Sequence, residues 1–208
     1  MHKKKFYFIV FEGAEGTGKS YQIKKLYNRL KNKKFNIIKT REPGGSNSAE
    51  KIRNLIFSKT KKQFDSLTDF FLMCASRNEH VKRLLLTAKK NKKIVICDRF
   101  VDSTHAYQVI GNKIDKKLNT LNQKYILQGL KPDLTIVLKS SLEAIFSRIK
   151  KRKKINKFDK LKIHFYKKVQ NAFLKIAKNN KNYYVFDSSK NTPDLEREIL
   201  ELVLKKLK

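Results

Sequence analysis

Five short apolar runs recur along the chain, separated by longer stretches in which apolar residues return with helical spacing. The runs cover residues 6–12, 36–40, 94–98, 133–139 and 183–187. Strands buried on both faces have such continuous apolar runs, and parallel neighbours need helical crossovers between them. The pattern therefore predicts a single α/β domain, a doubly wound sheet of five parallel strands flanked by helices. In such sheets, ligands bind beyond the carboxyl ends of the strands.

A glycine-rich segment directly follows the first run. Its sequence, Gly-Ala-Glu-Gly-Thr-Gly-Lys-Ser, has the spacing of a phosphate-binding P-loop. Glycines let backbone N–H groups approach a polyphosphate, Lys19 supplies a point charge, and Ser20 can ligate Mg²⁺. A helix starting near Gly18 would also present its positive dipole end to the anion. The segment predicts a nucleoside triphosphate site formed by Gly13, Ala14, Glu15, Gly16, Thr17, Gly18, Lys19 and Ser20.

Two further strand ends carry charged residues. Arg41 and Glu42 precede a Pro-Gly-Gly turn after the second run, and Asp98 and Arg99 end the third run. A guanidinium binds two phosphate oxygens at once, and an acidic group after a strand can organise the metal and the phosphates of a nucleotide. We expect these groups to face one cleft with the P-loop. An exposed ion pair at the first position and a structural Asp–Arg pair at the second remain alternatives.

Two helical segments add candidate contacts for a base and a sugar. Met73 and Arg77 lie four residues apart, which places them on one helix face, and Ser103, Tyr107 and Gln108 fall near one side of a second helix. Gln108 offers a donor and an acceptor to a base edge, and a Tyr ring can pack against a sugar. Residues 70–72 (Phe-Phe-Leu) are better explained as part of a core helix, and a plain amphipathic helix remains an alternative for the second segment.

Composition restricts the remaining function classes. The 208 residues carry a net charge of +32, almost entirely through lysine. Lysines are spread through predicted helices and turns, so we interpret them as a solvated surface and consider a nucleic-acid partner unlikely. The two cysteines lack metal or disulfide spacing and should be buried thiols, and the four histidines show no metal or triad spacing. No apolar run reaches the length of a membrane span, which leads us to expect a soluble cytoplasmic protein.

The order of these motifs resembles the thymidylate kinases of the bacterial type, nearly from end to end. The resemblance rests on Phe-Glu-Gly-Ala-Glu-Gly-Thr-Gly-Lys-Ser at 11–20, Thr-Arg-Glu-Pro-Gly-Gly at 40–45, Arg77, and Asp98-Arg99-Phe100 followed by Ser103, Ala106, Tyr107 and Gln108. It implies a P-loop nucleoside monophosphate kinase fold with a short lid at about residues 150–162. It also implies phosphorylation of dTMP to dTDP by ATP with Mg²⁺, a step of dTTP synthesis, and a homodimer.

The resemblance assigns roles residue by residue. Lys19, Asp98 and Arg99 would be catalytic, with Ser20 and Asp98 at the metal. The dTMP contacts would be Glu15 at the sugar, Arg41 and Arg99 at the phosphate, Arg77 and Gln108 at thymine, Met73 beside the base, Ser103 nearby, and Tyr107 against C2′.

The lid departs from the family pattern. Gly16 stands where one branch of the family has its catalytic arginine, so the catalytic positive charge should come from residues 148–159. Where the family usually has Asp-Arg, this chain has Asn156-Lys157, and Lys168 replaces a later arginine. Arg152 and Lys157 are therefore the two candidates for the catalytic cation. Lysine keeps the charge but lacks the bidentate fork.

A second departure is Met73, which stands where the family usually stacks a Phe on thymine. Methionine can cover a ring with less rigidity. A kinase for another nucleoside monophosphate or a deoxynucleoside is the first alternative function. A P-loop ATPase stimulated by nucleic acid is a distant one.

Overall fold

The computed structural model describes residues 5–58, 64–151, 162–190 and 192–208. Its strands are β1 (Tyr7–Glu12), β2 (Ile37–Arg41), β3 (Ile94–Asp98), β4 (Leu134–Lys139) and β5 (Tyr183–Asp187). Its helical segments are α1 (Lys19–Asn32), α2 (Asn47–Ile56), α3 (Ser66–His80), the π-helical η1 (Val81–Leu85), α4 (Leu86–Lys90), α5 (Val101–Thr104), the π-helical η2 (His105–Gly111), α6 (Lys116–Leu127), α7 (Leu142–Lys150), α8 (Ile163–Lys178) and α9 (Pro193–Leu207).

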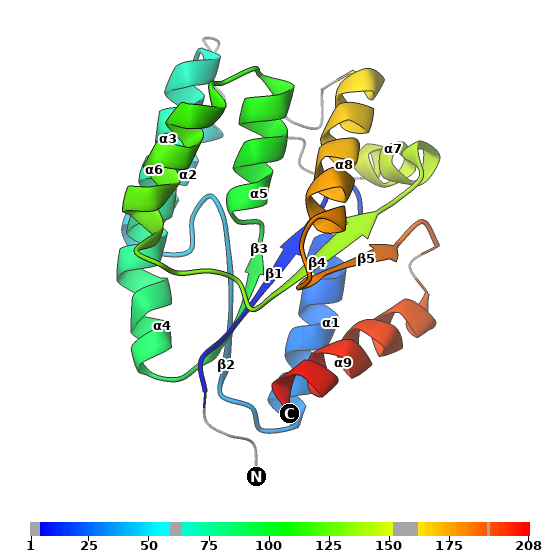
Figure 1. Cartoon of the computed structure of the whole chain (residues 1–208). Coiled ribbons are helices and arrows are strands. Elements are labelled where there is room, and N and C mark those ends of the chain that lie inside the picture. Colours follow the sequence, from blue (N-terminus) through cyan, green and yellow to red (C-terminus); the bar gives the residue numbers. More distant parts are fainter. Residues whose placement is uncertain (1–4, 59–63, 152–161, 191) are drawn as a thin grey trace.

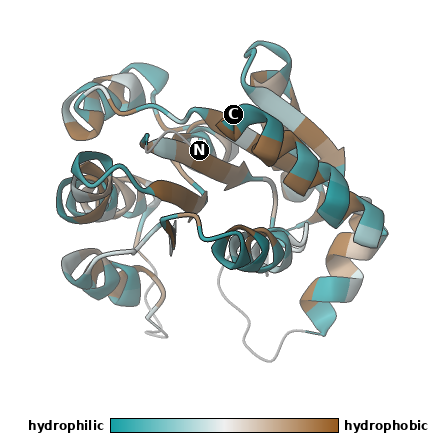
Figure 2. Cartoon of the chain, turned by 90° about the horizontal axis from the view of Figure 1, so that it is seen from below, coloured by the Kyte–Doolittle hydropathy of each residue, from teal (hydrophilic) through white to brown (hydrophobic). Residues whose placement is uncertain are grey.

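The five strands form one parallel sheet in the order β2-β3-β1-β4-β5. Each of the five apolar runs forms one of these strands, so the predicted fold class is confirmed. Helices connect successive strands and lie on both faces of the sheet (Figure 1). In Figure 2 the strands are mostly hydrophobic, whereas the helices carry much of the hydrophilic colour.

Alternate strand residues build separate cores on the two faces. Ile9 and Phe11 of β1 pack with α1 and α9, whereas Phe8 and Val10 pack with α3, η1 and α6. A third cluster joins η2, α7 and α8 beside β4. Successive strand residues point to opposite faces, and both faces here are apolar, which explains why the strands have unbroken apolar runs.

The sheet order brings three motif-bearing strand ends together. Because β3 lies between β2 and β1, the segments after these strands emerge side by side (Figure 1). The backbone N–H of Glu42 donates to the Asp98 carbonyl at 2.9 Å, and that of Arg99 donates to the Phe11 carbonyl at 2.9 Å. These bonds extend the sheet by one residue and fix the starting point of each motif.

Some sequence expectations need correction or stay open. Phe71, expected in the core, is 46% exposed, whereas Phe70 is fully buried. Both cysteines are buried free thiols, as expected. Most of the expected lid at 150–162, with Arg152 and Lys157, lies outside the described residues. The division into one domain with that lid stays a prediction.

Candidate active site

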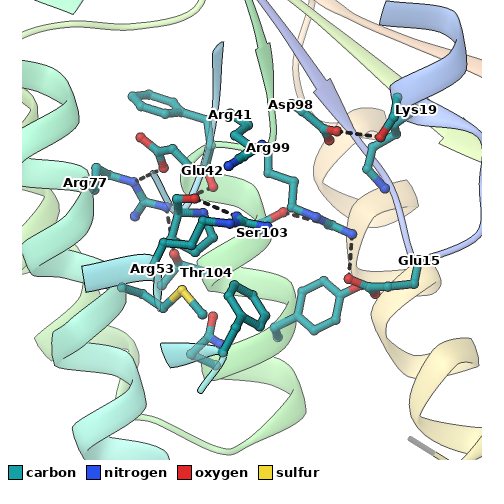
Figure 3. A pocket seen from close by; sticks show the side chains of 17 residues that line it. Glu15, Lys19, Arg41, Glu42, Arg53, Arg77, Asp98, Arg99, Ser103 and Thr104 are labelled. Carbon is teal, nitrogen blue, oxygen red and sulfur yellow. Dashed lines mark hydrogen bonds and ion pairs between the residues drawn. The ribbon is translucent and has the colours of Figure 1, made fainter. Parts of the chain in front are cut away.

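A cavity opens at the carboxyl ends of β1, β2 and β3 (Figure 3). It is lined by Glu15, Lys19, Ser20, Arg41, Glu42, Pro43, Arg53, Phe57, Met73, Arg77, Asp98, Arg99, Phe100, Ser103, Thr104, Tyr107 and Gln108. Every residue that we expected to contact the acceptor or the metal is in this set. Arg152 and Lys157 fall outside the described ranges.

Buried charge concentrates at this cavity. In the described part of the chain, the buried Glu, Lys and Arg side chains are Glu12, Glu15, Lys19, Glu42 and Arg77. Four of them line the cavity, and Glu12 bonds to its wall at Ser103. Charges are seldom buried without partners, because leaving water is costly. Such a concentration marks a site built to meet charged groups.

The P-loop wraps around the ammonium group of Lys19. Lys19 Nζ donates to the carbonyls of Gly13 at 2.9 Å and of Ala14 at 2.8 Å. Burial, with Arg99 nearby, lowers the pKa of Lys19 to about 8. Gly13 has a φ of +140°, and a Cβ there would lie 2.4 Å from the Leu138 carbonyl oxygen. Glycine is therefore required where the loop crosses the end of β4.

Gly16 has no space for a side chain. Its φ is +75°, and a Cβ would lie 2.9 Å from the backbone oxygen of Ile145 in α7. The Gly16 carbonyl also accepts a hydrogen bond from Arg148 at 3.1 Å. Arg148 donates further to the carbonyls of Ser188 at 2.6 Å and Ser189 at 2.9 Å. An arginine at position 16 would need a different packing of α7.

Asp98 and Ser20 form a polar pair beside Lys19. Ser20 Oγ donates to Asp98 Oδ2 at 3.0 Å, and Asp98 Oδ1 is buried without a hydrogen-bond partner among the described residues. A hydroxyl and a carboxylate with a spare oxygen are ligands that suit Mg²⁺. The residues here therefore fit a magnesium ion shared with phosphate oxygens. The Asp–Arg alternative is not observed, since Arg99 bonds elsewhere.

Arg99 connects the P-loop to the helix that follows β3. Its guanidinium donates to Glu15 at 2.7 Å, to the Gly13 carbonyl at 2.8 Å and to Ser103 Oγ at 3.0 Å. Burial favours the neutral acid at Glu15, but Arg99 and Lys19 outweigh it and hold the pKa of Glu15 below its usual range. Tyr107 donates its hydroxyl hydrogen to the other oxygen of Glu15. These contacts leave Glu15 ionised and fixed at one wall of the cavity.

The neighbours Arg41 and Glu42 do not pair with each other. Arg41 bonds to Glu50 at 2.9 Å, and its side chain is 52% exposed. Glu42 is buried and bonds to Arg77 at 2.7 Å and to His80 at 2.8 Å. Both residues line the cavity, as expected. The surface ion pair weighed as an alternative exists for Arg41, but with Glu50 rather than Glu42.

Arg77 lies in the wall formed by α3. Besides Glu42, it donates to the Phe100 carbonyl at 3.0 Å and to Thr104 Oγ1 at 2.9 Å, both through Nη2. Its Nη1 is buried and has no hydrogen-bond partner in the described part of the chain. Met73, one turn earlier, and Gln108 of η2 line the same cavity. The cavity therefore has an end with an available donor, an amide and a thioether.

Five lining residues were not selected from the sequence: Pro43, Arg53, Phe57, Phe100 and Thr104. Pro43 and Phe100 stand inside quoted motifs, and their position in those motifs could have identified them. Arg53 and Phe57 belong to α2 or follow it, where no motif points to the cavity. Two buried residues behind the wall were also missed, Glu12 and His80, the latter because histidine spacing along the chain gave no signal.

Comparison with known proteins points to one family. The thymidylate kinase family model matches residues 11–199. A thymidylate kinase of Mycoplasma capricolum is 36% identical over 208 residues, covering 97% of this chain and 96% of the relative. One from Wolbachia pipientis is 40% identical over 173 residues, covering 82% of this chain and 84% of the relative.

A solved structure matches the fold over nearly its whole length. It is the crystal structure of thymidylate kinase from Ehrlichia chaffeensis, with a TM-score of 0.75 and 30% identity, covering 96% of this chain and 99% of that chain. The family model spans the P-loop, the cavity and the first half of α9. This chain belongs to the thymidylate kinase family.

Proposed function

We propose that this chain transfers the γ-phosphoryl group of ATP to dTMP, giving ADP and dTDP for dTTP synthesis. One observation carries the proposal beyond family membership: a single cavity joins a P-loop lysine and a Ser–Asp pair to Arg77, whose Nη1 has no hydrogen-bond partner among the described residues. A donor polyphosphate and an acceptor base fit such a cavity simultaneously. Holding two reactants in register is how a phosphotransferase achieves most of its rate.

At the donor end, Lys19 and the loop backbone would hold the phosphates of ATP, and Ser20 and Asp98 would hold Mg²⁺. Bound there, the ion would neutralise charge on the phosphate oxygens. Lys19 now bonds to the loop's own carbonyls, so a phosphate would take over part of that hydrogen bonding. With a pKa of about 8, Lys19 is mainly protonated at neutral pH and can donate to an anion.

At the acceptor phosphate, Arg99 and Arg41 would supply positive charge from the ends of the neighbouring strands β3 and β2. Arg99 is anchored by Glu15, whereas Arg41 is half exposed and would exchange its ion pair with Glu50 for the phosphate of a ligand. Glu15 would contact the sugar, and the Tyr107 ring would lie against C2′, where a ribose hydroxyl would clash. Ser103 orients Arg99 through its hydroxyl.

At the base, Arg77 would donate to a carbonyl oxygen through Nη1, Gln108 would bond the base edge, and Met73 would cover the ring. A buried donor without a partner is unfavourable until a ligand supplies an acceptor. A base that supplies a matching acceptor therefore gains more binding free energy than it would from an exposed hydrogen bond.

The catalytic positive charge would come from the lid. Gly16 has no room for a side chain, which supports a cation from Arg152 or Lys157 rather than from the P-loop. Such a cation stabilises the charge on the transferring phosphoryl group, and its loss can cost about 10³-fold in kcat. Alanine variants at 152 and 157 would identify the residue, because kcat should fall further when the catalytic cation is the one removed.

We test the function with a coupled assay over a panel of nucleoside monophosphates and deoxynucleosides, with ATP, with and without Mg²⁺. We expect dTMP to be the preferred acceptor and turnover to stop when EDTA removes the metal. Preference for another acceptor would favour the alternative kinase. ATP hydrolysis stimulated by DNA or RNA, without transfer to any acceptor, would favour the nucleic-acid ATPase.

The proposed homodimer has a candidate surface on α3 and α6, which pack against each other. Leu67 and Phe71 of α3 and Leu121 and Tyr125 of α6 are exposed and lie four residues apart on each helix. Apolar side chains gathered on neighbouring helices favour association. Sedimentation should show a dimer, and Phe71→Glu should shift it toward monomer; a wild-type monomer at micromolar concentration would exclude the proposal.

The cytoplasmic location of the protein and its lack of a nucleic-acid partner stay predictions. In the described ranges, no helix is long and apolar enough to cross a membrane. Lys19 is the only buried lysine among the residues that the structure describes, which supports the solvated-surface interpretation of the net charge. A cytoplasmic location, where the nucleotide substrates would be available, is the one that we propose.

A further inference from the structure

We propose that His80 and Thr40 are positioning residues for base recognition, acting through Glu42 on Arg77. This inference rests on the proposed function, since it assumes that Arg77 meets the base of the acceptor. Neither His80 nor Thr40 lines the cavity, so neither would touch the substrate.

The chain of contacts begins at the end of β2. Thr40 Oγ1 and His80 Nε2 are 2.8 Å apart, and His80 Nδ1 is 2.8 Å from Glu42 Oε1. His80 is fully buried at the end of α3. With Thr40 donating to Nε2, the remaining ring proton is on Nδ1 and is donated to Glu42. One imidazole therefore joins a strand hydroxyl to a carboxylate in the cavity wall.

Glu42 passes this constraint to Arg77. Its second oxygen, Oε2, accepts from Arg77 Nε at 2.7 Å. Burial favours the neutral acid, but Arg77 and His80 outweigh it and lower the pKa of Glu42, so the carboxylate stays charged. Both oxygens of Glu42 are thus engaged by side chains of α3. The carboxylate can rotate only by breaking one of these bonds.

Arg77 is held at two edges and available at one. Nε is bound to Glu42, and Nη2 is bound to the Phe100 carbonyl and Thr104 Oγ1. Because the guanidinium is planar and rigid, these bonds fix the direction of Nη1. That nitrogen is buried and lacks a partner among the described residues. Arg77 lines the cavity, so the network holds in its wall a guanidinium with one nitrogen that bonds to no other described residue.

An oriented donor selects by hydrogen-bond chemistry. A guanidinium donates and cannot accept, so it suits the carbonyl that thymine and uracil have where cytosine has an amino group. A site with buried polar groups rejects the wrong partner because those groups would stay unpaired. A guanidinium free to turn away would lose that discrimination.

The turn after β2 is shaped around the same pair. Gly45 has a φ of +94°, and a Cβ there would lie 2.4 Å from Thr40 Oγ1 and 2.7 Å from His80 Nε2. The Gly44 N–H also donates to Ser76 Oγ of α3 at 3.0 Å. The turn therefore closes directly over the Thr40–His80 contact and joins it to α3. This packing protects the contact from water, which strengthens it.

The test compares His80→Asn with His80→Leu. The Asn amide can donate near the Nδ1 position, whereas Leu removes both ring nitrogens. For His80→Leu we expect KM for dTMP to rise about tenfold, kcat to change less than about threefold and KM for ATP to stay unchanged. The preference for dTMP over dCMP, measured as the ratio of the inhibition constant of dCMP to KM for dTMP, should fall. His80→Asn should recover most of both effects.

A second pair keeps the proposal testable if His80→Leu fails to fold. Thr40→Val removes the hydroxyl and should raise KM for dTMP about two- to fivefold, whereas Thr40→Ser should match the wild type. His164→Leu, at an exposed position of α8, is the control for loss of an imidazole.

The inference is overturned if KM for dTMP and the dCMP ratio stay unchanged in His80→Leu and Thr40→Val, or if KM for ATP rises in parallel. A wild-type enzyme that does not prefer dTMP would instead defeat the proposed function. The two failures are therefore distinguishable.

Discussion

The two ends of the cavity are built by different means. At the phosphate end, the ligand-facing groups are backbone, the Lys19 ammonium and a Ser20–Asp98 pair, most of them from one continuous loop. At the base end, side chains from α3, α5 and the turn after β2 hold one another, which leaves Arg77 Nη1 without a hydrogen-bond partner among the described residues. Phosphate recognition needs dense positive charge and tolerates variation, whereas base recognition needs one donor in one direction. We expect mutations to separate these two requirements.

The largest effect should come from Lys19→Ala. Removing the ammonium takes away charge that the transferring phosphoryl group needs, so kcat should fall about 10³-fold or more. Circular dichroism should show the fold retained, because the loop backbone remains. Lys24→Ala, an exposed lysine on the same helix, is the matched control. Substantial turnover in Lys19→Ala would refute the P-loop assignment.

Arg77→Lys should weaken binding at the base end of the cavity alone. Lysine keeps a cation for Glu42 but lacks the planar fork, so the donor toward the base would be lost. We expect KM for dTMP to rise about 10²-fold with KM for ATP unchanged, measured by initial rates. An equal rise in KM for dTMP and for ATP would mean that the two ends of the cavity are not independent.

Glu12 bonds to residues of the cavity wall, and its titration makes the stability of the fold depend on pH in a testable way. It accepts from the backbone N–H groups of Phe100 and Ser103 and from Ser103 Oγ. Burial and the nearby Asp102 raise the pKa of Glu12 to about 8. Between the pKa of the unfolded chain, near 4.5, and that of the native state, the native state holds a proton that the unfolded state has released. Stability should therefore fall as pH rises through this window.

Glu12→Gln removes this titration. The fall in Tm between about pH 5 and pH 8 should become shallower by several °C, roughly as one buried titrating group contributes in a chain of this size. Thermal melts at half-unit pH intervals measure it. Parallel curves for wild type and variant would show that Glu12 does not titrate there.

The smallest effect is expected from Met73→Phe. A flat ring would cover the base more rigidly than a thioether, so dTMP should bind about two- to fivefold more tightly. KM for ATP should not change. An unchanged or raised KM for dTMP would show that Met73 does not face the base.

The sequence predicted most of the fold and of the cavity for one physical reason. Buried parallel strands have continuous apolar runs, and their carboxyl ends bring Lys19, Arg41 and Asp98 together. It did not identify His80 or Glu12, because their hydrogen-bond partners lie 38 and 91 residues away along the chain. These bonds form only when α3 and α5 pack on the sheet. The exposure of Phe71 was missed because a helix periodicity does not tell which face meets solvent.

The most direct test of the central claim is calorimetric titration of the chain, without ATP, with dTMP, dUMP and dCMP. The account predicts one dTMP site, binding of dUMP within about tenfold of dTMP, and dCMP weaker by about 10²-fold, because Arg77 donates to a carbonyl and cannot accept from an amine. Equal affinity for dTMP and dCMP would contradict it, since the phosphate end alone would then account for binding.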